Sequence, residues 1–142
     1  MFVPEEFITF ASEVAHASSL AGSPAVRART AYGRMYYGLF LIIRAILVQR
    51  HGVPVRRVEH GRLFMRLQHS TIRGDLRDLG RELERLYSFR QQADYVVAPT
   101  GNVREMIEDP AIAAVVAGQT LTLANRVAQF DFAPLVGLLL AY

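Results

Sequence analysis

Evenly spaced leucines between residues 75 and 95 constrain this chain more than any other feature, because they require a helix with one buried face. They recur at steps of three and four residues, the spacing of an apolar stripe on an α-helix. The stripe is formed by Leu76, Leu79, Leu83 and Leu86. At about 100° per residue, Arg90 and Asp94 fall inside the same stripe. The opposite, solvent-facing side carries Arg77, Arg81 and Arg85.

Two charged residues on the buried side of a helix need an explanation, because a buried charge must be paired or hydrogen-bonded. Arg90 and Asp94 stand in the less favourable order for a helical pair, with the cation before the anion. One interpretation is a structural ion pair that fixes how this helix docks. The other is a functional Arg90 that points into a cleft, with Asp94 orienting it.

The rest of the chain also has helical periodicity and lacks the alternating pattern of strands. Capping residues, prolines and apolar spacing predict further helices at about 4–20, 24–50, 58–69 and 110–129. Residues 35–48 are apolar nearly all round, so the second helix should be the central, buried element. Residues 98–102 contain Pro, Gly and Asn and predict a loop.

Length and composition favour one globular domain over residues 1–142, with a core over about 5–130 and an apolar tail at 131–142. There is no Cys, so neither disulfides nor thiol chemistry are available. The N-terminus lacks the basic and apolar regions of a signal peptide. We therefore expect a soluble, cytoplasmic protein without a membrane segment.

Arginine is concentrated in the middle of the chain. Residues 27–90 hold 14 Arg against 5 acidic residues, a net charge of +9, whereas the remainder has a net charge of −6. A basic middle suits a polyanion or an acidic partner. The alternative is that these Arg residues only solvate the outer faces of the helices. The four His residues are too scattered for a metal site, and no cofactor motif is present.

Three short motifs follow one another across residues 25–130. They are R-Q-Q-A-D-Y at 90–95, the segments A-Y, Y-Y-G-L-F and R-A-I-L between 31 and 47, and H-G at 60–61. The first resembles the R-x-x-A-D-Y signature of small prokaryotic HEPN-domain proteins. The second is similar to the A-Y-Y-A-x-F…A-R-A-L-L helix of that family, and the third to the S/T-H-x-G that opens its next helix.

The resemblance implies an all-α, up-and-down bundle of four or five helices. It also implies a homodimer, RNA or nucleotides as ligands, and a toxin–antitoxin pair with a small nucleotidyltransferase. Catalytic members cleave RNA without metal through an R-x4–6-H motif, in which the Arg stabilises phosphorane charge and the His moves a proton. Arg90 matches the Arg of this motif, but residues 91–97 contain no His.

We therefore expect a HEPN-type effector or binding module, with Arg90 contacting an anion, Asp94 orienting it and Tyr95 beside them. Further pocket candidates are Tyr36, Tyr37, His60 and Arg44. The alternative is a non-catalytic interaction bundle with a structural Arg90–Asp94 pair. A third hypothesis is a ribonuclease that uses His60 or His69 from another helix. A dimer is also favoured by Phe130, Phe132 and residues 135–140, which extend past the last predicted long helix without an evident partner.

Overall fold

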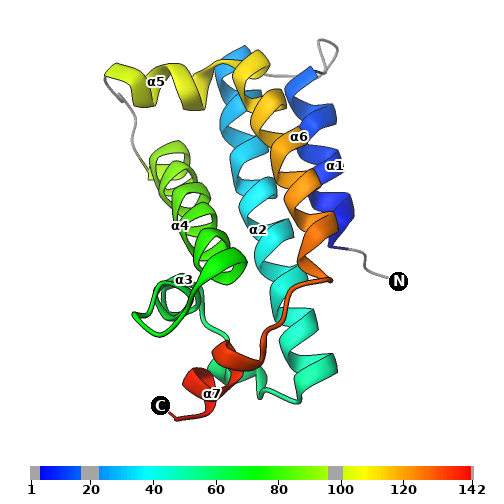
Figure 1. The fold of residues 1–142 in the computed structure, drawn as a ribbon. Coiled ribbons are helices and arrows are strands. Elements are labelled where there is room, and N and C mark those ends of the chain that lie inside the picture. The colour runs from blue at the N-terminus through cyan, green and yellow to red at the C-terminus, as the bar shows by residue number, and fades with distance from the viewer. Residues whose placement is uncertain (1–3, 17–22, 96–100, 142) are drawn as a thin grey trace.

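The described part of the chain is all-α, without a β-strand. The computed structural model describes residues 4–16, 23–95 and 101–141. These residues form seven α-helices and one 3-10 turn (Figure 1). The elements are α1 (Glu5–His16), α2 (Pro24–His51), η1 (Val55–Arg57), α3 (His60–Leu67), α4 (Gly74–Tyr95), α5 (Gly101–Glu108), α6 (Pro110–Val127) and α7 (Ala133–Ala141).

Helix α2 is the central element, as its apolar sequence predicts. The Ser23 hydroxyl accepts a hydrogen bond from the Val26 amide at 3.2 Å and caps its first turn. Gly52, at φ 66°, ends the helix in the left-handed conformation. Helices α1 and α6 pack on one side of α2 and α4 on another, so the core surrounds α2 (Figure 1).

Helix α2 is also long and apolar enough to cross a bilayer by length and composition. However, 61% of its most apolar 18-residue window is buried inside the fold. Burial of this kind is what the core helix of a globular bundle requires.

Two glycines let helices approach closely. A Cβ atom at Gly38 would lie 2.6 Å from the Ile8 side chain, so α1 can cross α2 only where no side chain intervenes. A Cβ atom at Gly80 would lie 2.6 Å from the Leu67 side chain, which sets α4 directly against α3. The second approach matters for the site, because it fixes α3 beside the apolar side of α4.

The structure corrects several expected boundaries. Helix α3 is shorter than the predicted 58–69, and the 3-10 turn η1 lies between α2 and α3. The predicted end of the first helix, at 17–20, lies outside the described residues, as does most of the predicted loop at 98–102. Gly101 and Asn102 begin α5, a helix that the sequence reading missed. Its Ile107 is buried and its Met106 carbonyl accepts a 2.5 Å hydrogen bond from the Tyr32 hydroxyl, so tertiary contacts offset weak helix formers.

The apolar tail packs inside its own chain, so the expectation that it offers an unpartnered surface to a dimer is wrong. After α6 the chain runs on toward the C-terminal end of α2, and α7 lies beside that end and α3 (Figure 1). Phe132, Leu135 and Leu139 are buried there. The tail therefore completes the core, and the surplus apolar surface predicted from the sequence is largely absent.

Candidate functional site

An aromatic cluster forms where α2, α3 and α4 meet. Its members are Tyr36, Tyr37, Phe40, His60, Phe64 and Tyr87. The three residues from α2 stand at relative positions i, i+1 and i+4, which places them on adjoining faces of the helix. The Tyr36 ring is fully buried and lies 5.3 Å from the Tyr87 ring of α4, so it forms the floor of the cluster.

His60 opens α3 and inserts its ring into this cluster. The imidazole stacks on Phe40 with a centroid separation of 3.9 Å. Its Nδ1 lies 2.7 Å from the Tyr36 hydroxyl. Burial lowers the pKa of His60, and the nearby Arg90 and Arg44 lower it further, so the ring is uncharged at neutral pH. Burial likewise raises the pKa of Tyr36, which keeps its hydroxyl protonated.

Arg90 covers the cluster from α4. Its guanidinium carbon lies 4.7 Å from the centre of the Tyr37 ring and 5.6 Å from that of Tyr36. Its Nη2 donates a long 3.4 Å hydrogen bond to the Tyr37 hydroxyl. Its Nε lies 3.4 Å from Asp94 Oδ2. The side chain of Arg90 is 18% exposed and that of Asp94 is 40% exposed. Arg90 is thus positioned mainly by aromatic faces, with a half-exposed carboxylate at its edge.

Arg44 approaches the same cluster from farther along α2. Its guanidinium carbon lies 5.6 Å from the centre of the Phe40 ring, on which His60 also stacks. Within the described ranges no carboxylate forms an ion pair with Arg44. Two guanidinium groups therefore act on a neutral imidazole, and in the described part of the chain Asp94 is the one carboxylate that pairs with either of them, through Arg90.

Five of the seven residues singled out from the sequence meet here: Tyr36, Tyr37, Arg44, His60 and Arg90. Asp94 borders the group, and Tyr95 is 70% exposed and makes no ring contact with it in the described part of the chain. His69 lies at the far end of α3, where its Nδ1 contacts Thr71 at 2.8 Å. Sequence reasoning missed Phe40, Phe64 and Tyr87, although Tyr87 precedes Arg90 by one helical turn.

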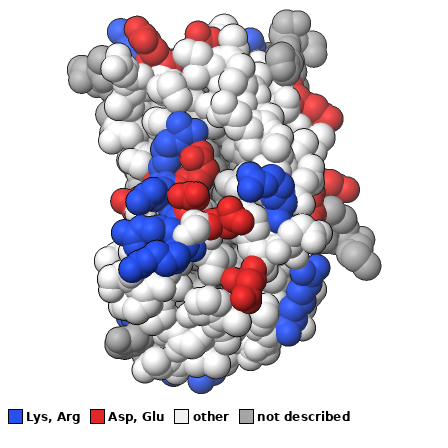
Figure 2. Space-filling model, in the orientation of Figure 1, with Lys and Arg blue, Asp and Glu red and all other residues white. Residues whose placement is uncertain are grey.

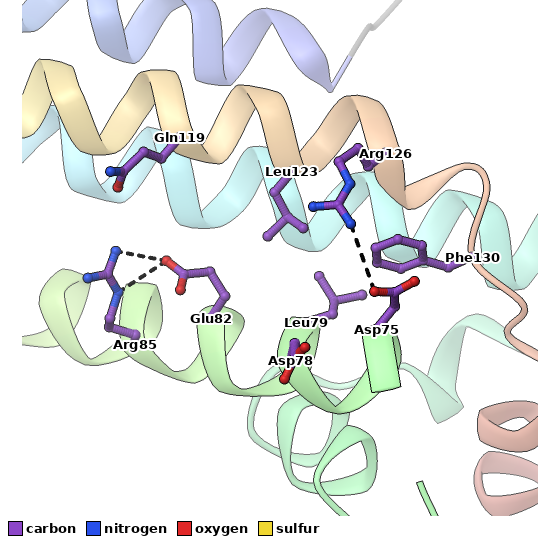
Figure 3. A pocket seen from close by; sticks show the side chains of 9 residues that line it. All are labelled: Asp75, Asp78, Leu79, Glu82, Arg85, Gln119, Leu123, Arg126 and Phe130. Atoms are coloured by element: carbon purple, nitrogen blue, oxygen red, sulfur yellow. Dashed lines mark hydrogen bonds and ion pairs between the residues drawn. The ribbon is translucent and has the colours of Figure 1, made fainter. Parts of the chain in front are cut away.

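A second charged region lies at the other end of α4, in a groove of about 390 Å³ between α4 and α6 (Figure 3). Leu79, Leu123 and Phe130 line its apolar part. Its charged and polar lining consists of Asp75, Asp78, Glu82, Arg85, Gln119 and Arg126. Figure 2 shows acidic and basic side chains mixed together over this face.

Each carboxylate of the groove has an arginine partner. Glu82 lies 2.8 Å from Arg85 along α4, and Asp78 lies 3.5 Å from Arg81. Across the groove, Asp75 and Arg126 approach to 3.8 Å (Figure 3). The carboxylates and arginines of the groove therefore compensate one another locally.

Comparison of the chain with protein-family models, with curated proteins and with solved structures found no match. The likeness to HEPN proteins therefore rests on the three motifs alone, and the assignment of a function rests on the site.

Proposed function

We propose that the protein is a HEPN-type effector or binding module that holds a phosphate group of RNA or of a nucleotide at Arg90. The observation that supports this most is the charge arrangement around His60. Burial lowers the pKa of this ring most, Arg90 and Arg44 lower it further, and among the described residues Asp94 is the one carboxylate that pairs with either arginine. A phosphate placed there would neutralise an existing excess of positive charge.

The chemistry of the cluster suits a nucleic-acid ligand. A guanidinium presents several donors in a plane that matches phosphate oxygens. Arg90 is already held over Tyr37, so little side-chain entropy would be lost on binding. Arg44 would then contact a neighbouring phosphate of the same RNA strand. The basic middle of the sequence would attract such a polyanion over longer distances.

The remaining family-derived features belong to the same proposal. They are an up-and-down bundle of HEPN type, a cytoplasmic homodimer and a nucleotidyltransferase encoded nearby as the antitoxin. The buried tail no longer supports the dimer, so sedimentation at micromolar concentration has to decide it. A ribonuclease reaction would need a His other than the absent one after Arg90, and His60 is the histidine that the fold places near this Arg.

The alternative proposal is a non-catalytic interaction bundle in which Arg90 has a structural role. The contacts of Arg90 with Tyr36, Tyr37 and Asp94 favour it, because they already occupy part of the guanidinium. On that reading the aromatic faces and the carboxylate satisfy the Arg, and no ligand is required.

Binding measurements on Arg90→Gln separate the two proposals. Loss of a hydrogen bond to a charged group corresponds to about 10- to 100-fold in affinity. We expect a loss of this size for a fluorescent single-stranded RNA or for ATP. Arg81→Gln is the matched control, because Arg81 lies on the same helix and is exposed with an Asp78 partner. Equal affinity of wild type and Arg90→Gln, with both folded by circular dichroism, would rule out the phosphate proposal.

A further inference from the structure

We infer that His60 presents a fixed N–H donor at Nε2, so that its ring is a third phosphate contact beside Arg90 and Arg44 and does not serve as a proton acceptor. This inference rests on the proposed phosphate site. It adds the role of His60, which the sequence motif and the position of the ring leave open. That role is decided by which of the two ring nitrogens carries the proton.

The buried phenol of Tyr36 decides the tautomer. Tyr36 is 0% exposed, and its one hydrogen-bond partner among the described residues is His60 Nδ1 at 2.7 Å. Burial raises the pKa of Tyr36, so its hydroxyl keeps its hydrogen. If Nδ1 carried a proton, it would donate to the Tyr36 oxygen and leave the phenolic hydrogen without an acceptor. An unsatisfied buried donor is costly, so Tyr36 donates and Nδ1 accepts.

The protonation of Nε2 follows from the acceptor role of Nδ1. A neutral imidazole has one protonated nitrogen, so the proton of His60 resides on Nε2 when Nδ1 accepts from Tyr36. The stacking contact with Phe40 at 3.9 Å holds the plane of the ring. His60 as a residue is only partly buried, and the inference places the phosphate on the Nε2 side of its ring.

Burial and, after it, the neighbouring arginines keep the ring neutral until an anion arrives. From α2 and α4 the charged or titratable groups around it are Tyr36, Tyr37, Arg44, Tyr87 and Arg90. Next to it in sequence, Glu59 and Arg62 pair with one another at 3.4 Å. Both guanidiniums lower the pKa of His60, and a bound phosphate would reverse part of this effect. Phosphate binding should therefore raise the pKa of His60.

Nuclear magnetic resonance on the free protein tests the tautomer without any ligand. Long-range ¹H–¹⁵N correlation spectra above pH 7 should show His60 with its proton on Nε2. Tyr36→Phe should produce a mixture of tautomers, because the donor to Nδ1 is gone. Tyr32→Phe is the matched control: it removes an equally buried hydroxyl one turn earlier on α2, which bonds the Met106 carbonyl. A wild-type proton on Nδ1 would overturn the inference.

Titration with inorganic phosphate and with a short single-stranded RNA tests the contact itself. His60→Leu should weaken binding about tenfold, the loss of one hydrogen bond to a charged group. His60→Gln should stay within about threefold of wild type, because its amide can supply an N–H near the Nε2 position. The His60 resonances should shift with phosphate, and the pKa of His60 should rise.

The possible outcomes distinguish a failure of the role inferred for His60 from a failure of the proposed phosphate site. Wild-type binding together with a proton on Nδ1, or equal affinity of His60→Leu and wild type, defeats the role of His60 alone. Absence of binding in the wild type defeats the phosphate site and the proposed contact with it. RNA cleavage that His60→Gln abolishes, while phosphate binding persists, would show that His60 transfers a proton and would overturn the donor role.

Discussion

Helix α4 carries arginines and carboxylates at both of its ends, but their burial and their partners differ between the two ends. In the α4–α6 groove, Asp75, Asp78 and Glu82 each have an arginine partner, and these pairs are largely exposed. In the aromatic cluster, Arg90 is mostly buried over Tyr37, and its ion-pair partner is the half-exposed Asp94.

The difference shows that burial and partners decide the role of a charged residue. Exposed ion pairs contribute about 0–1 kcal/mol and are screened by salt, so the groove charges chiefly keep the surface hydrated. A guanidinium held against aromatic rings is partly desolvated and keeps its orientation. Its remaining donors can then act on a ligand. Substitutions at matched positions in the two regions can test this contrast.

The largest contrast in the free energy of unfolding is expected between an aromatic residue of the cluster, Tyr36, and one of the groove, Phe130. Tyr36 is fully buried, so Tyr36→Ala should lower the free energy of unfolding by about 3–5 kcal/mol, as for other large aromatic-to-alanine changes in a core. Phe130 lines the groove and is only partly buried, so Phe130→Ala should cost about 1–2 kcal/mol. Urea unfolding measures both values. Equal losses would show that the groove is as much a part of the core as the cluster.

A smaller contrast in stability is expected between Arg90 of the cluster and Arg126 of the groove. Arg90→Ala removes contacts with two aromatic rings and a hydrogen bond, and should cost about 2 kcal/mol. Arg126→Ala removes an exposed pair and should cost less than about 1 kcal/mol. Thermal melts combined with denaturant titrations provide the values.

Asp94→Ala distinguishes the two supports of Arg90. Because Asp94 is half exposed, its removal should cost no more than about 1 kcal/mol. A loss as large as that of Arg90→Ala would mean that the carboxylate, and not the aromatic rings, holds the guanidinium. That result would favour the structural pair proposed from the sequence.

Much of α4 and α2 could be predicted from the sequence, because their periodicity reflects one-sided or complete burial. The leucine stripe placed Arg90 and Asp94 on the inner face; Arg90 lies there, but the prediction is wrong for Asp94, which is exposed beyond the end of the stripe. The same arithmetic placed Arg77 on the outer face, yet its guanidinium is part-buried and donates to the Gln68 and His69 carbonyls at the end of α3. Helical angles describe a single helix. They do not predict which neighbouring element will cover part of its outer face.

The convergence at the site depends on contacts that no local pattern encodes. Tyr36 and His60 are separated by 24 residues, and their hydrogen bond depends on how α3 docks on α2. Short α5 escaped detection for a similar reason, because Gly101 and Asn102 resemble loop residues and the burial of Ile107 is tertiary. The buried tail was misjudged because its partner, the end of α2 with α3, is distant in sequence.

The pH dependence of stability should distinguish the cluster from the groove more finely. The folded-state pKa of His60 is lowered, so between its ordinary value near 6.5 and the folded value the unfolded chain binds more protons. The free energy of unfolding should therefore fall as the pH decreases through this window. His60→Phe should flatten the slope, whereas Arg126→Gln in the groove should leave it unchanged. A slope that persists in His60→Phe would assign it to other groups.

The smallest expected effect is the coupling between Asp75 and Arg126, the pair that crosses the groove. Their nearest atoms lie 3.8 Å apart, and their side chains are 64% and 61% exposed. Water screens such a pair, and ordering two long side chains costs entropy, so a double-mutant cycle with alanine should give about 0–0.5 kcal/mol. The coupling should vanish in about 1 M salt, where the screening length is about 3 Å. A coupling above about 1 kcal/mol that resists salt would mean that this pair holds α4 against α6. The groove would then be a closed structural contact, and burial alone would not explain why Arg90 differs from Arg126.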